Sequence, residues 1–258
     1  MNGKKAKNQV VQVRWGRIVA LISAILFLAA GGIILYMRTR RNAGELTVFP
    51  HSYFFIVLSE HQSQNEAIQS AQNFRQDGIG SGFFMQIEEG FFTVYSVFRQ
   101  ERKAGSEVVR LIREGLEPHI VKLTPEPLYF EISAERETAL RFYEPFLSIH
   151  SLFDSVYFLQ HQAEGKRLSL RQAELSILSI KRRVNTAKSQ VMSDITFEFR
   201  DKILHSFFDT IQFSIENMFH QINLDTLSQD LQYLLCVIAW EYRATIEELR
   251  ESAVTFAY

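Results

Sequence analysis

Cysteine is almost absent from this chain of 258 residues. Cys236 is the only one, which excludes an intrachain disulfide and a cysteine-based metal site. It lies in the apolar run LLCVIAW, where a small buried hydrophobic side chain is the expected role. A domain without disulfides must be held together by its hydrophobic core, and the 47% apolar residues are sufficient for one.

Motifs of known catalytic chemistry are also missing. The sequence has no HExxH, no Gly-rich phosphate loop, no Gly-x-Ser-x-Gly and no CxxC. The acidic pair Glu88 and Glu89 is placed in a predicted turn, where solvation explains it. Seven histidines are scattered along the chain: His51, His61, His119, His150, His161, His205 and His220. We therefore expect no enzyme, no catalytic residue, no metal site and no cofactor.

Acidic residues are lacking from the first 41 positions, which contain eight Lys and Arg. Residues 42–258 consequently carry 20 basic against 29 acidic side chains, a net charge of −9. Nucleic-acid phosphates need a basic surface, so this acidic region predicts no nucleic-acid partner.

Charge of either sign is absent from Ile18 to Met37. At ~1.5 Å per residue, these 20 residues match the ~30 Å of a bilayer core, which predicts a single transmembrane helix over 18–37. Five basic residues precede the run and three follow it, which favours a cytoplasmic tail over 1–17 and an extracytoplasmic location for the bulk of the chain. The flanking basic residues also suit anionic lipid headgroups, so the membrane is an expected partner.

Strand and helix patterns alternate after a short linker at 38–47. The strand-like run SYFFIVLS is followed by the helical pattern NEAIQSAQNFRQDG, then by a hairpin of GFFMQIEEG and FFTVYSVF. A second helical pattern, ERKAGSEVVRLIREG, and a strand at 118–123 complete the region. The order β-α-β-β-α-β over 48–130 predicts a split, ferredoxin-like module: an antiparallel four-stranded sheet with both helices on one face and the other face open.

Helical periodicity dominates from 133 to 258. Four helices are predicted, over 134–162 with a break near Pro145, 169–193, 195–221 and 225–255. We interpret the basic cluster of Lys181, Arg182 and Arg183 as a solvated helix face. The expected fold class is thus α+β: an N-terminal transmembrane helix, the split β-α-β-β-α-β module, and a mostly α-helical C-terminal region.

Two similar half-motifs make up the β-α-β-β-α-β region: YFFIVLSEHQSQNEAIQSAQNFRQDG and FFTVYSVFRQERKAGSEVVRLIREG. Through them, residues 52–124 resemble the SPOR (sporulation-related repeat) domain of bacterial envelope proteins. The family commonly has Gln in its first strand and Gly near the ends of its first and third strands, where this chain has Ile56 or Val57, then Ser59 and Ser96. The resemblance implies a single-pass protein of the bacterial cell membrane that binds peptidoglycan glycan strands stripped of stem peptides and localises to division or sporulation septa.

Strand alternation selects the candidate glycan-binding residues, because residues two apart share a face. If the intervening residues point into the helices, the open face presents aromatic, amide and hydroxyl side chains that suit a neutral glycan. These candidates are Phe54, Ile56, Phe84, Gln86, Thr93 and Tyr95. A register error of one residue would exchange the two faces. The alternative is that the same surface packs on the C-terminal helices, on another envelope protein or on a second copy, which would make the protein an interaction or oligomerisation module.

Overall fold

The computed structural model describes residues 43–88, 90–133, 136–192, 198–220 and 222–255. The chain divides into two compact units, one formed by 46–130 with 136–258 and the other by 1–45 with 131–135. The described strands are β1 Ala43–Val48, β2 Tyr53–His61, β3 Phe83–Ile87, β4 Gly90–Phe98, β5 His119–Leu123 and β6 Leu128–Ser133. The described helices are α2 Gln64–Gln76, α3 Glu101–Arg113, α4 Arg136–Glu164, α5 Leu170–Met192, α6 Glu198–Met218 and α7 Leu227–Thr255.

The expected fold class needs correction in its transmembrane part. Within the described ranges, none of the helices combines the length and the apolar character needed to cross a membrane. Residues 18–37, on which the prediction of a membrane-spanning helix rested, lie outside the described residues. The structure supports an α+β fold of six described helices and a four-stranded antiparallel sheet.

The four-stranded sheet has the strand order β3-β4-β2-β5 and antiparallel pairing throughout, while β1 and β6 form a separate two-stranded sheet. Helix α2 begins where the Ser63 side chain accepts a hydrogen bond from the backbone N–H of Glu66, a serine N-cap. Helices α2 and α3 each end just before a glycine with positive φ, Gly78 and Gly115, as the sequence predicts. The order β-α-β-β-α-β is therefore set by local sequence signals.

A bulge interrupts the pairing of β2 with β4. Ile56 is opposite Ser96 and Val57 is opposite Val94, so Tyr95 has no partner residue on β2. A bulge of this kind lets two successive side chains point to the same side of a sheet. Here it turns the Tyr95 side chain toward α3, where its hydroxyl meets Glu107.

Side-chain contacts identify the two faces of the sheet. Thr93 donates a hydrogen bond to the carbonyl of Ala67 in α2, and Phe54, Ile56 and Tyr95 share a hydrophobic cluster with α3. On the opposite face, Tyr53 packs against rings of α4 and α7, and Phe83 against a tyrosine of α7. The sheet therefore has no open face, because α7 covers the side that α2 and α3 leave free.

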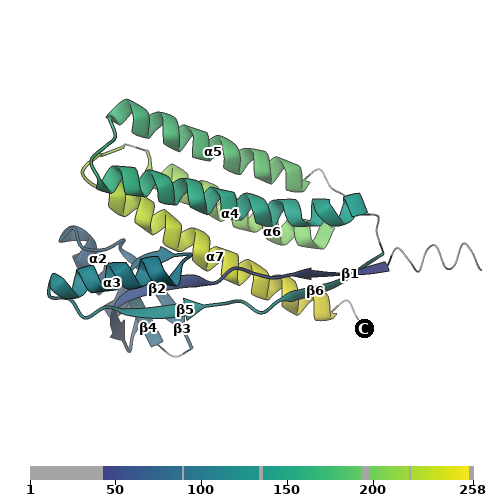
Figure 1. Cartoon of the computed structure of the whole chain (residues 1–258), viewed down its shortest axis with the longest axis horizontal. Coiled ribbons are helices and arrows are strands. Elements are labelled where there is room, and N and C mark those ends of the chain that lie inside the picture. Colours follow the sequence, from purple (N-terminus) through teal and green to yellow (C-terminus); the bar gives the residue numbers. More distant parts are fainter. Residues whose placement is uncertain (1–42, 89, 134–135, 193–197, 221, 256–258) are drawn as a thin grey trace, which may run out of the picture. The chain divides into compact units, whose positions relative to one another are not determined.

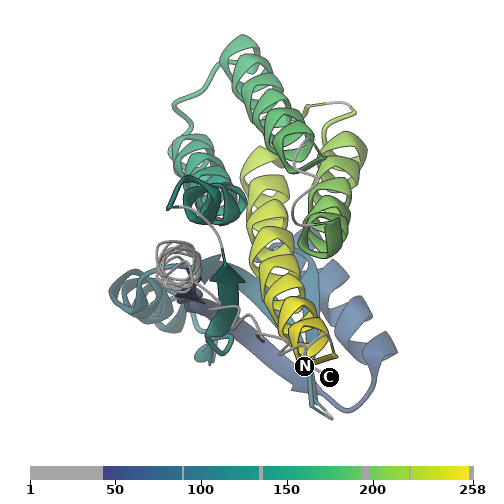
Figure 2. The same ribbon diagram turned by 90° about the vertical axis from the view of Figure 1, so that its right-hand side faces the viewer.

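The C-terminal helices form a bundle whose α7 is shared with the sheet. Figure 1 and Figure 2 show α7 running between the sheet and the other helices of the bundle. Its residues Leu231, Leu235 and Ile238 are fully buried, as is Cys236, and burial raises the pKa of the Cys236 thiol. The predicted break near Pro145 is wrong, since α4 runs through this proline to Glu164. Buried residues that follow it, such as Phe146 and Ile149, hold the helix in place through packing.

Candidate functional site

A cleft between α3 and α4 is the candidate site that joins the sheet module to the helical region. It consists of two cavities of about 670 and 480 Å³ that share the lining residues Phe98, Gln100, Lys103 and Tyr157. We call it the α3–α4 cleft. Volumes of this size are usual for small-molecule sites, which measure about 300–1,000 Å³.

Each wall of the cleft comes from a different part of the chain. The bulged end of β4 supplies Tyr95 and Ser96, and α3, which starts three residues after β4 ends, supplies Lys103, Glu107 and Arg110 at helical spacing. The facing wall belongs to the C-terminal half of α4, and Gln232 of α7 closes the cavity. The module that resembles SPOR and the helical region thus build one site together.

A hydrogen-bonded group fixes the Tyr95 hydroxyl. Tyr95 donates to Glu107 Oε1 (2.8 Å) and accepts from Arg110 Nη2 (2.7 Å), while Arg110 also pairs with Glu107 and Glu114. Burial, reinforced by the nearby Glu107 carboxylate, raises the pKa of Tyr95. The phenol therefore stays protonated and serves as a hydrogen-bonding group at neutral pH.

Aromatic side chains form a second part of the cleft. The rings of Phe98 and Tyr157 meet edge to face with centroids 6.1 Å apart, and Lys103 Nζ lies 4.5 Å from the centroid of the Tyr157 ring. Beside them, Arg99 Nη1 donates to both carboxylate oxygens of Asp154 at 2.8 Å. This ion pair joins the loop before α3 to α4 and so fixes the mouth of the cleft.

Two glutamine amides lie deep in the cleft, each only 6% exposed. Gln160 donates to Glu164 and to Ser228 of α7, at 3.3 Å in each case. Gln232 differs, because its amide forms no hydrogen bond with any of the residues that the structure describes. The fully buried polar atoms that lack a partner among the described residues belong to Tyr53 and His150, so the Gln232 amide still reaches the space of the cavity. Its position in a cavity lining marks Gln232 as a group available to a ligand.

A histidine pair adjoins the cleft through His51. The rings of His51 and His150 meet edge to face at 3.9 Å, and His150 also contacts the Tyr242 ring at 5.2 Å. Burial, the second histidine and Arg99 lower the pKa of His150 to about 3. His150 Nδ1 and the Tyr53 hydroxyl are buried and form no hydrogen bond with the residues that the structure describes. Within the described part of the chain no three His, Cys, Asp or Glu side chains gather as metal ligands.

The six residues predicted from strand alternation share one face, but it is the face covered by α2 and α3. Phe54 and Tyr95 line the α3–α4 cleft. Ile56 is fully buried against α3, and Thr93 is bonded to α2. Phe84 and Gln86 lie on the edge strand β3, where they pair with Thr93 and Phe91, and do not line the cleft. The residues predicted to lie on an open face therefore lie on the face that α2 and α3 cover, and their neighbours in the strands lie on the other face.

Sequence reasoning missed the residues that the C-terminal helices contribute, above all Tyr157, Gln160 and Gln232. Gln232 did leave a signal, since it is a polar residue within the apolar stretch LQYLLCVIAW at a helical position that must be buried. The charged side chains of the cleft are of both signs and largely paired, so the arrangement suits a hydroxylated, uncharged ligand. Comparison with protein families, with curated proteins and with solved structures gave no match for this chain.

Proposed function

We propose that this protein is a non-enzymatic binding protein that holds a glycan strand in the α3–α4 cleft. The observation that carries this proposal is the unpartnered Gln232 amide beside the Tyr157 and Phe98 rings. Sugar rings have apolar C–H faces surrounded by hydroxyl groups. Aromatic side chains contact such faces, and amides both donate to and accept from hydroxyls.

Peptidoglycan is the glycan that we propose. The support is the resemblance of residues 52–124 to the SPOR domain, whose family binds strands stripped of stem peptides in the bacterial envelope. The proposal moves the binding surface from the sheet to the cleft, and it includes an extracytoplasmic location and enrichment at division or sporulation septa. A fluorescent fusion spread evenly around the cell would contradict the septal part alone.

The Gln232→Leu variant of the full chain tests the cleft. We expect it to lose about tenfold in binding to amidase-treated sacculi in a sedimentation assay, because the amide contacts are removed. Its melting temperature should change little, since the replaced amide has no hydrogen bond to lose with the described residues.

Gln86→Leu is the matched control, because this exposed glutamine belongs to the original candidate set but lies outside the cleft. It should bind sacculi as the unmodified chain does. Equal binding by both variants would refute the cleft as the glycan site, whereas loss in Gln86→Leu alone would restore the surface first predicted from the sequence.

Exposed leucines on α5 favour a second candidate function, self-association. Leu170, Leu175 and Leu178 are 46%, 59% and 44% exposed on one helix. A cluster of exposed apolar side chains usually contacts protein. In this reading the protein is an interaction module and α5 is its contact surface.

Light scattering of the full chain tests self-association. If α5 forms the interface, the double variant Leu175→Ser/Leu178→Ser should convert an oligomer to a monomer, because the buried apolar area is lost. Val109→Ser/Ile112→Ser on α3, where both residues are similarly exposed, should leave the mass unchanged. A monomeric unmodified chain at high concentration would exclude this function.

A further inference from the structure

The three consecutive basic residues of α5, Lys181, Arg182 and Arg183, do not share the same partners. Lys181 Nζ pairs with Glu216 of α6 at 2.8 Å. Arg183 instead reaches to α4, where it donates to the hydroxyls of Ser155 and Ser151, the latter at 2.6 Å. Within the described ranges, neither Arg183 nor Arg182 has a carboxylate partner. The two arginines are thus not part of a uniformly solvated, ion-paired helix face.

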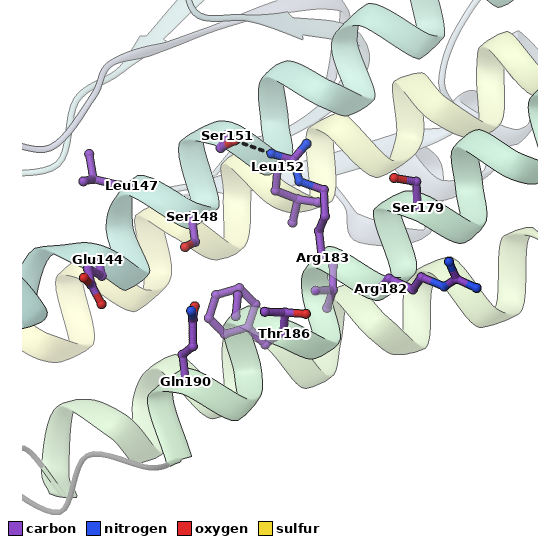
Figure 3. Close-up of a pocket in the computed structure, with 13 residues that line it drawn as sticks. Glu144, Leu147, Ser148, Ser151, Leu152, Ser179, Arg182, Arg183, Thr186 and Gln190 are labelled. Carbon is purple, nitrogen blue, oxygen red and sulfur yellow. Dashed lines mark hydrogen bonds between the residues drawn. The ribbon is translucent and has the colours of Figure 1, made fainter.

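Both arginines line a groove between α4 and α5. The groove consists of cavities of about 580 and 700 Å³ that share Leu147, Ser151, Ser179 and Arg183. Arg183 is therefore central, and Arg182 lines the smaller cavity. Figure 3 shows the Arg183 side chain extending toward Ser151, while Glu144 lies toward the other end of this cavity. We call this surface the α4–α5 groove.

Hydroxyl groups dominate the polar lining of the α4–α5 groove. They belong to α4 and α5, and two of them, Ser151 and Ser155, accept hydrogen bonds from Arg183. The full set is Ser148, Ser151, Ser155, Ser176, Ser179 and Thr186. Each hydroxyl can donate one hydrogen bond. A group with several acceptor oxygens, such as a phosphate, matches the Arg183 guanidinium and the hydroxyls beside it, while Figure 3 shows Arg182 extending away from them.

The charged residues of the groove also favour an anionic ligand. Residues 42–258 carry a net charge of −9, yet the charged residues of the groove are three arginines and two acids. One of those acids, Asp154, is already bound to Arg99. An uncompensated positive site within an acidic domain favours an anion, and the guanidinium fork matches phosphate oxygens bidentately.

We propose that the α4–α5 groove is a phosphate-binding site, which holds the phosphate group of a phosphomonoester or phosphodiester ligand at Arg183 and the hydroxyls beside it, with Arg182 adding positive charge at the smaller cavity. The proposal does not depend on glycan binding, although the groove and the α3–α4 cleft share the lining residues His51, Arg99 and Asp154. The exposed Leu147 and Phe158, each 63% exposed, provide apolar contact for the remainder of the ligand.

Calorimetric titration of the full chain tests the proposal with three probes, inorganic phosphate, glycerol phosphate and glycerophosphoglycerol. We expect saturable binding of at least one probe, and about fivefold or greater weakening in Arg182→Gln and in Arg183→Gln. Preference for glycerol phosphate or inorganic phosphate identifies a small phosphorylated ligand. Preference for glycerophosphoglycerol identifies a phosphodiester, as in a lipid headgroup or a phosphate-linked polymer.

Lys181→Gln is the matched control, because it removes the same charge from the neighbouring position but its amine pairs with α6. It should change the affinity by less than about twofold. Arg183 also links α5 to α4, so Arg182→Gln, which breaks no such bond, keeps the test valid if Arg183→Gln unfolds. Equal weakening by Lys181→Gln, equal binding of acetate, or no binding of any probe at 20-fold the protein concentration and above would overturn the proposal.

Discussion

Replacing Phe153 by alanine is expected to lower the free energy of unfolding by about 3–5 kcal/mol, the usual loss for a large ring removed from a core. Phe153 is 1% exposed, and its ring packs on Tyr53 of β2 with centroids 5.1 Å apart. Tyr53 in turn contacts Tyr242 of α7 at 5.7 Å. The substitution therefore leaves a cavity where sheet, α4 and α7 meet, and urea unfolding followed by circular dichroism measures the loss.

The control for Phe153→Ala is Phe158→Ala, the same change five residues further along α4. Phe158 is 63% exposed, so its removal should alter stability by less than about 0.5 kcal/mol. Similar losses in the two variants would mean that α4 does not share a core with the sheet. A biphasic unfolding curve for the unmodified chain would lead to the same conclusion.

The second large effect is a loss of stability in acid that depends on His150. Burial, followed by the effects of His51 and Arg99, lowers the pKa of His150 to about 3 from its ordinary 6.5. The unfolded chain takes up a proton near pH 6.5, whereas the folded chain resists it until about pH 3. The contribution of neutral His150 to the free energy of unfolding is thus complete above pH 6.5 and is lost as the pH falls toward 3. Since His150 is partly exposed, we expect a loss of about 2 kcal/mol between pH 7 and pH 4.

His150→Phe should reduce this pH dependence, because the ring is kept and the titrating nitrogen is removed. His51 beside it also has a lowered pKa, caused by burial and by Arg99 and partly offset by the Asp154 carboxylate. His161→Phe on the same helix, where the side chain is 69% exposed, should retain the full dependence. Melting temperatures of the three chains at pH 7 and pH 4.5 provide the measurement, and parallel declines in all three would contradict the role of His150.

Local signals were sufficient to predict the order of strands and helices from β2 to α7, whereas β1 and β6, which pair with each other, were not predicted. Ser63 and Gly78 delimit α2, and Gly115 ends the second helix of the module, because capping and positive φ depend on residues close in sequence. Pro145 was misjudged for the opposite reason. Its effect on α4 is decided by tertiary packing of residues such as Ile149, which a local pattern does not contain.

The faces of the sheet could not be assigned from alternation. Strand β2 contains the continuous apolar run Tyr53–Leu58, and its residues from Tyr53 to Val57 are buried on both sides. Alternation identifies the buried face of a strand only when the other face is polar. Here α7 covers the second face, so both faces are apolar. The bulge at Tyr95 then changes the parity along β4 as well.

The candidate site was only partly predictable. Phe54 and Tyr95 were selected for the right chemistry, an aromatic ring and a hydroxyl near amides, although for the wrong face. The partners that complete the cleft, Tyr157 and Gln232, are 62 and 137 positions beyond Tyr95 in sequence. Helix packing brings these distant residues together, and no single sequence segment contains a pattern that predicts it.

The position of α7 over the sheet has a consequence for folding during synthesis on the ribosome. The strands of the four-stranded sheet are complete by residue 123, but the helix whose rings pack on Tyr53 and Phe83 begins only at Leu227. Because synthesis proceeds at about 5–20 residues per second, the apolar face of the sheet that α7 covers stays exposed for several seconds before α7 is synthesised. Nascent chains of this protein should therefore be clients of chaperones that hold exposed hydrophobic surface until the last helix emerges.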